Sequence, residues 1–283
     1  MNLLEQVVLG WECVAMAFGQ LQRPALWVPW LLLGVLQALV LASLIGFAHP
    51  WVSPLVAPLL MRAAGDAVLH YPNLFRVLPG LYARADFLLA MVPGVLAAGA
   101  SSALVLSVAT GRPASAAAGL RRALGRGLAL VVANLPFLLM VLALSFGSEA
   151  WLASRGSGGL VVRVVTLAVL LATLVLQALG LYATPLVMLG GMSPLAAWRE
   201  LPHLLGRGGG TALTLVLLAS VPLLPLQQLA RISDRIVDRG RPELVAVLLA
   251  AEIALTLVVS ALLTGAAMLA VRALEDEEAE WGG

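Results

Sequence analysis

The stretch PASAAAGLRRALGRG at residues 113–127 and the stretch PLAAWRELPHLLGRG at residues 194–208 repeat one pattern 81 positions apart. Seven of the fifteen aligned pairs are identical, and both copies end in Leu-Gly-Arg-Gly. Each copy is a short amphipathic segment that leads directly into a long apolar one. Because self-similarity at a fixed period is typical of repeat architectures, the pattern predicts a protein built from repeated units.

The composition of the whole chain indicates a membrane protein. Of its 283 residues, 61% are hydrophobic and 11% are charged, against roughly 45–50% and about 25% in soluble domains. A soluble fold of this size needs more polar surface, so most of the chain must face lipid. The net charge of +2 is too small to favour a nucleic-acid partner.

The apolar runs predict an all-α membrane protein with six transmembrane helices. Three amphipathic segments, at residues 3–21, 113–126 and 194–207, each precede a pair of these helices and are expected to lie in the membrane interface. The predicted spans are residues 25–48, 87–108, 128–146, 161–189, 211–229 and 244–271. We therefore expect one membrane domain, residues 1–272, made of three two-span units.

The predicted units are residues 1–110, 111–190 and 191–272, and an acidic tail at 273–283 is expected to be disordered. Between the first two spans, the apolar residues 52–61 are too few to cross the bilayer, and Pro54 and Pro58 interrupt them. This pattern favours an interfacial or re-entrant hairpin. Residues 147–159 are expected to form a short loop.

Arg23, Arg126 and Arg207 each stand just before a predicted span. We interpret them as membrane-entry residues, whose stems pack on apolar surface while their guanidinium groups reach lipid phosphates. With two spans per unit, all three would lie on one face of the membrane. Eight arginines fall on that face and nine on the other, so charge does not decide orientation. We expect both termini in the cytoplasm, since a first helix without a signal sequence usually leaves its N-terminus there.

Glu252 is the carboxylate expected well within a span, where a charge costs roughly 2.5–3.5 kcal/mol on insertion scales. One interpretation is an intramembrane proton or cation site, with Gln177 and Asn134 as neighbours. The alternative is that the sixth span begins later, which would leave Glu252 near the interface.

Other features predict neither an enzyme nor a metalloprotein. The sequence contains no nucleophile, zinc or phosphate-binding motif, and we expect no cofactor. The single cysteine, Cys13, excludes an internal disulfide, and His49, His70 and His203 have no metal-ligand spacing. The charged residues 231–241 are expected to form a solvated helical turn, with lipid-phosphate binding as the alternative.

The phrase YATPLVMLGGMSPLAAWR at residues 182–199, followed by Leu205-Gly206-Arg207 and a new apolar run, resembles six-span bacterial inner-membrane proteins of unknown function. That group includes the membrane domain fused to some glycerophosphodiester phosphodiesterases. The resemblance is clearest over residues 180–230. It implies a fold and a bacterial membrane, and it carries no catalytic residue onto this chain.

Two functions fit these features. We expect a non-enzymatic scaffold or accessory subunit of an envelope or lipid-related system, with the bilayer as one partner. A protein partner could bind through the acidic tail or the interfacial helices. The alternative is a small permease or channel with a midplane polar site near Glu252. A continuous polar cavity would favour transport, whereas a dry bundle packed through small residues would favour the scaffold.

Overall fold

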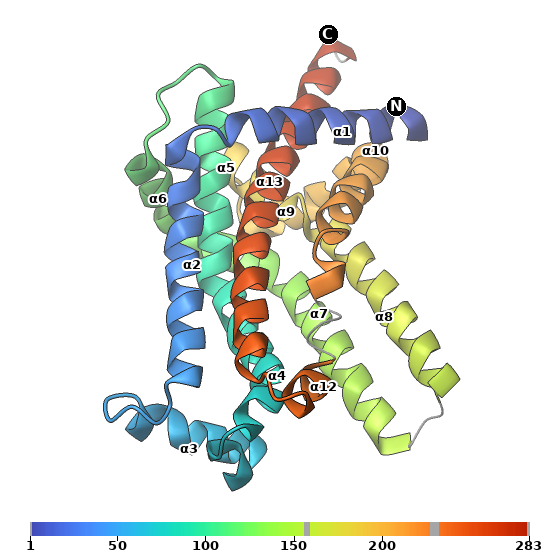
Figure 1. Ribbon diagram of the computed structural model, residues 1–283. Helices are drawn as coiled ribbons and strands as arrows, with labels where there is room; N and C mark the ends of the chain where they lie inside the picture. Colours follow the sequence, from blue (N-terminus) through green and yellow to red (C-terminus); the bar gives the residue numbers. More distant parts are fainter. Residues whose placement is uncertain (1, 156–158, 227–231, 282–283) are drawn as a thin grey trace. The chain divides into compact units, whose positions relative to one another are not determined.

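The computed structural model describes residues 2–155, 159–226 and 232–281, and every regular element within them is a helix (Figure 1). This confirms the all-α prediction for the described ranges. Five helical segments there are long and apolar enough to cross a membrane, as expected of a multi-pass membrane protein. They are Pro24–Ile45, Asn73–Ala109, Gly127–Leu152, Gly159–Leu189 and Glu243–Glu278.

The fifth predicted span, at residues 211–229, is not one of these five segments. α10 (Pro194–Ser220) contains the second amphipathic copy and the first part of this span, with non-helical dihedral angles at Gly208 between them. Residues 227–229 of the predicted span lie outside the described ranges. Six spans and a threefold repeat therefore remain predictions.

The chain forms two compact units, which do not coincide with the three units predicted from the repeat. Unit 1 consists of the described parts of Met1–Pro29, Val95–Ala219 and Ser260–Gly283, and unit 2 of the described parts of Trp30–Gly94 and Ser220–Val259. The units divide within α2 and α13, because different portions of a long helix pack against different neighbours. A repeat in the sequence cannot reveal such a division.

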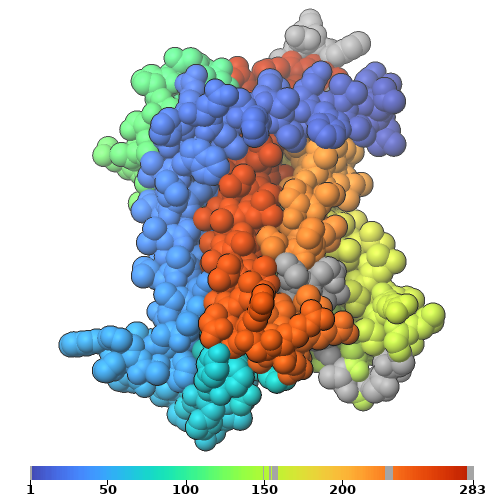
Figure 2. All heavy atoms as spheres, viewed as in Figure 1, coloured from blue at the N-terminus to red at the C-terminus, as the bar shows by residue number. Residues whose placement is uncertain are grey.

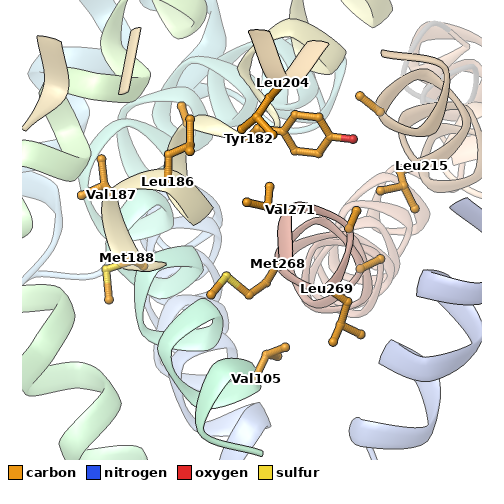
Figure 3. Close-up of a cluster of buried hydrophobic side chains, with 14 of the residues drawn as sticks. Val105, Tyr182, Leu186, Val187, Met188, Leu204, Leu215, Met268, Leu269 and Val271 are labelled. Atoms are coloured by element: carbon orange, nitrogen blue, oxygen red, sulfur yellow. The ribbon is translucent and has the colours of Figure 1, made fainter. Parts of the chain in front are cut away.

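Unit 1 has an apolar core rich in small residues. Its helices are α1 (Leu3–Gln20), α5 (Val95–Ala109), α6 (Ala116–Gly125), α7 (Gly127–Arg155), α8 (Gly159–Gly180), α9 (Ala183–Leu189), most of α10, and the ends of α2 (Pro24–Ile45) and α13 (Glu243–Trp281). In the core, Tyr182, Leu186 and Met268 are fully buried together (Figure 3). The Tyr182 hydroxyl donates to the Gly208 carbonyl at 2.9 Å, which satisfies a backbone group at the kink of α10.

α1 packs on unit 1 through small side chains and leaves its large ones exposed. Gly10, Cys13 and Ala17 are buried, whereas Trp11 and Phe18 are more than half exposed. Figure 2 shows α1 in blue. The capping box formed by Asn2 and Glu5 begins the helix. The predicted amphipathic helix is therefore present, with an exposed apolar face of the kind that interfacial helices place in lipid.

Cys13 should react very slowly with thiol reagents in the folded protein. Burial, assisted by the neighbouring Glu12 carboxylate, raises the pKa of the Cys13 thiol to about 12, so the reactive thiolate is nearly absent at pH 8.5. We expect maleimide labelling to be at least roughly 100-fold slower than for an exposed cysteine. The matched control is Met16→Cys in a Cys13→Ala background, because Met16 is exposed on the same helix. Equal labelling rates would contradict the buried packing of α1.

Unit 2 surrounds a second apolar core. It contains α2 from Trp30 onward, α3 (Ser53–Ala64), the 3-10 turn η1 (Asp66–Leu69), α4 (Asn73–Leu89), the π-helical turn η2 (Ala90–Gly94), α12 (Ser233–Asp238) and α13 as far as Val259. Phe75, Leu78 and Leu249 contribute to its core. At the surface, Arg76 pairs with Asp238 at 2.6 Å, so Asp238 of the charged segment 231–241 pairs with α4.

Three predicted segments differ in the structure. Residues 53–61 belong to the single helix α3 instead of a hairpin, with Val52 as the N-cap, because Pro54 lies in the first turn, where no N–H is needed. The predicted loop at 147–159 is helical as far as Arg155, since SEAWLASR contains good helix formers. The tail is helical through Trp281, and Arg207 binds the carboxylates of Glu277 and Glu278.

The helical segment that contains the second predicted span begins earlier than that span. α4, η2 and α5 form one continuous helical segment, Asn73–Ala109, although Pro93 lies inside it. Proline lacks the N–H that an α-helix requires, and a π-helical turn at Ala90–Gly94 accommodates it without ending the helix. As a result, Asp86 lies within the membrane-length segment.

Candidate intramembrane polar site

A cluster of four polar side chains lies among the helices of unit 2. Gln37 is on the buried face of α2, about 20 Å from the start of the helix, and only 5% of it is exposed. α13 approaches α2 closely at Gly34, where an added Cβ would stand 2.5 Å from Leu257 Cδ1. This close packing holds the Gln37 amide away from water.

α4 contributes Tyr82 and Asp86, which are one helical turn apart. The Gln37 amide donates from Nε2 to Asp86 Oδ1 at 2.6 Å. Tyr82 is 5% exposed, and its ring packs in the apolar core with Leu78 and Leu249. The phenol and the carboxylate therefore project from the buried side of α4, together with the amide from α2.

Glu252 comes from α13, nine residues after Glu243, or about 14 Å along the helix. Both interpretations of Glu252, an intramembrane site and a place near the interface, remain predictions. Its carboxylate is close enough to Asp86 and Tyr82 to interact electrostatically with both. Glu252 also lines a cavity of about 10 Å³ with Pro79, which is about the room that one water molecule needs.

The cluster contains more hydrogen-bond acceptors than donors. Gln37 Oε1 and Tyr82 Oη are buried without a partner among the described residues. The described ion pairs include neither Asp86 nor Glu252. Within the same ranges, no group of three or more His, Cys, Asp or Glu side chains is placed to hold a metal ion.

The residues predicted as neighbours of Glu252 belong to unit 1. Asn134 donates from Nδ2 to the Leu130 carbonyl at 2.9 Å and to Thr184 Oγ1 at 3.0 Å, and Gln177 is exposed on α8. The predicted set of Glu252, Gln177 and Asn134 remains untested. Asp86 was missed because the predicted second span began at residue 87.

A larger apolar groove lies between α2, α3 and α4 of unit 2. Its volume is about 570 Å³, within the range of small-molecule sites. Leucine side chains from all three helices form its walls, and the polar residues in its lining are Ser43 and Arg84. Side chains of an α-helix lean towards its N-terminus, so Arg84 leans towards the end of α4 that packs with α3.

Arg122 of α6 and Arg126, the residue that follows α6, bind the C-terminal end of α9. Arg126 donates from Nη1 to the Val187 carbonyl at 2.5 Å, and Arg122 donates from Nη2 to the Met188 carbonyl at 2.9 Å. Cations are favourable where a helix leaves carbonyls without intrahelical partners. Gly191 is required beside them, because its φ is +66° and an added Cβ would lie 2.6 Å from Arg126 Nη2.

Arg207, like Arg126, donates a hydrogen bond from its guanidinium group to a backbone carbonyl. It lies immediately before the kink at Gly208 and donates from Nη2 to the Leu274 carbonyl at 2.8 Å. Arg126 likewise stands between α6 and α7, and Arg23 is exposed between α1 and α2. Two of the three predicted membrane-entry arginines therefore bind protein carbonyls, and their contact with lipid phosphates remains a prediction.

Comparisons of the chain with protein-family models, curated proteins and solved structures give no match. The resemblance to six-span inner-membrane proteins accordingly remains a proposal. The functional assignment depends on the geometry of the two units.

Proposed function

We propose that this chain is a non-enzymatic protein of the bacterial cytoplasmic membrane that serves as a scaffold or accessory subunit of an envelope or lipid-related system. The observation that carries the proposal is the groove between α2, α3 and α4. Its leucine-rich walls and volume of about 570 Å³ suit a lipid chain better than a polar solute. The groove binds the acyl part of a membrane lipid, and Arg84 favours an anionic headgroup at the α3 end.

The small-residue packing of unit 1 supports the same function. α5 buries Gly99, Ala100, Ser101 and Ala103, and such residues let membrane helices pack at close range. The exposed apolar face of α1 provides a surface for the bilayer or for a partner subunit. Because Glu277 and Glu278 already bind Arg207, α1 is a better partner surface than the acidic tail.

We also propose that the chain has six spans in three units. Support comes from α1, α6 and the first part of α10, each of which precedes an apolar segment. The shared use of Arg126 and Arg207 to bind carbonyls supports equivalence between the second and third units. Cysteine accessibility in intact cells, scanned through residues 211–229, would test the additional span and the orientation.

Filling the groove should displace bound lipid. Ala85 lines the groove, and Ala85→Trp places a bulky ring within it. We expect about a tenfold loss of co-purified anionic phospholipid, measured by mass spectrometry after extraction in a mild detergent. Ala83→Trp is the control, because Ala83 is exposed on the same helix. Equal lipid content in both variants and the wild type would contradict binding in the groove.

A second function, a small permease or channel, is favoured by the carboxylates of Asp86 and Glu252 inside unit 2. It predicts flux of Na⁺ or protons into proteoliposomes above that of protein-free liposomes, and loss of this flux in Glu252→Gln. The scaffold predicts no such flux. It also predicts that the same membrane proteins co-purify with the wild type and with Glu252→Gln.

A further inference from the structure

We propose that Gln37, Tyr82, Asp86 and Glu252 form a binding site for one monovalent cation, either a proton or Na⁺. The inference concerns this cluster alone and does not depend on the groove or on the scaffold function. The two possible ligands share one chemistry, a single positive charge held by oxygen atoms in a site that excludes water.

The first argument is the charge of the site. Asp86 and Glu252 would bring two negative charges into a membrane-length bundle, at roughly 2.5–3.5 kcal/mol each on insertion scales. Among the described residues, the charged and titratable groups that interact with these carboxylates are each other and Tyr82 from α4, while α2 contributes the neutral Gln37. Arg84 projects from the other side of α4 into the groove. Nearby carboxylates in such a setting bind a proton or a cation in preference to remaining doubly ionised.

The second argument is the hydrogen-bond inventory. The Gln37 amide must turn its nitrogen towards Asp86, since a carboxylate only accepts. This orientation leaves Oε1 as an acceptor, buried beside the carboxylate and without a partner among the described residues. The Tyr82 hydroxyl, which is also buried and lies close to Asp86, can donate one hydrogen bond. Among the described hydrogen bonds, the second Asp86 oxygen, the Glu252 carboxylate and Gln37 Oε1 have no donor, and the Tyr82 hydroxyl can satisfy only one of these acceptors. A bound proton or cation provides the missing positive partner.

The third argument is the type of ligand atoms. Carboxylate, amide and phenol oxygens are hard ligands that suit a hard cation such as Na⁺ or H⁺. The cavity beside Glu252 has room for about one water molecule, so a dehydrated ion or a proton fits better than a hydrated ion. Side chains from α2, α4 and α13 bring these oxygens together, without a metal-binding motif in the sequence.

The test uses the full-length protein in detergent, with two measurements. Thermal unfolding is recorded in NaCl and in choline chloride at equal ionic strength, and the infrared band of protonated carboxyl groups is recorded at pH 7. If Na⁺ is the ligand, it should raise the unfolding temperature by about 3–5 °C at roughly ten times its dissociation constant. Asp86→Asn and Glu252→Gln should each abolish that shift. If a proton is the ligand, Na⁺ has no effect, and the protonated-carboxyl band is present in the wild type and lost in one of the two variants.

Asp234→Asn is the matched control, since Asp234 is an exposed carboxylate of unit 2, and it should behave like the wild type in both measurements.

Tyr82→Phe keeps the ring and removes only the hydroxyl, which provides a further variant if an Asp86 substitution prevents folding. It should reduce the Na⁺-dependent shift or change the frequency of the carboxyl band. If the infrared spectrum shows both carboxylates ionised and Na⁺ does not raise the unfolding temperature, the proposal is wrong. Co-purification of lipid should be unchanged in all of these variants, so that failure of the groove and failure of the cation site can be distinguished.

Discussion

Replacing both Arg122 and Arg126 with alanine is expected to lower the free energy of unfolding by about 2–4 kcal/mol. The two guanidinium groups donate to the carbonyls of Met188 and Val187 at the end of α9. Hydrogen bonds from charged donors stabilise by about 1.5–3 kcal/mol each, and partial exposure of the arginines reduces their sum. The measurement is reversible unfolding of the purified protein in mixed detergent micelles.

The control for this loss is Arg121→Ala, because Arg121 is an exposed cation on the same helix and should change stability by less than about 0.5 kcal/mol. Lysine at positions 122 and 126 keeps both charges but loses the planar fork. We therefore expect the double lysine variant to fall between the wild type and the double alanine variant. Equal stability of the wild type and the double alanine variant would show that these contacts do not hold α9.

Gly119→Val should destabilise unit 1 by about 3 kcal/mol. A Cβ at this position would lie 2.8 Å from Leu104 Cγ and 3.1 Å from the carbonyl oxygen of Ala100. The leucine can turn aside, but the backbone oxygen belongs to α5 and cannot move without shifting that helix. α6 would then separate from α5, and thermal unfolding should occur at a lower temperature.

Gly125→Val tests whether this loss comes from packing. Gly125 ends the same helix, and nothing lies within 4 Å of an added Cβ there. The substitution should change the free energy of unfolding by less than about 0.5 kcal/mol. Valine has a higher helix propensity than glycine, so a loss as large as that at position 119 would indicate that the destabilisation does not come from the contact between α6 and α5.

The sequence alone was sufficient to predict the helices that depend on local chemistry. α1 was predicted from its 3.6-residue pattern, and α6 begins with Ser115 as the N-cap. The aligned Arg-Gly pairs marked the junction after α6 and the kink at Gly208. These features are determined within one or two helical turns, where capping groups, glycine and apolar periodicity act on the backbone directly.

The candidate site required the tertiary structure. Glu252 could be identified because a carboxylate interrupts an apolar run, but its neighbours Gln37, Tyr82 and Asp86 lie on two other helices, far away in the sequence. Asp86 also depends on the π-helical turn at Pro93, which keeps α4 and α5 in one segment. Likewise, Arg126 has the local pattern of a lipid-facing cation but binds the end of α9. Periodicity shows which side of a helix is buried, whereas the contacts it makes there depend on how the helices pack together.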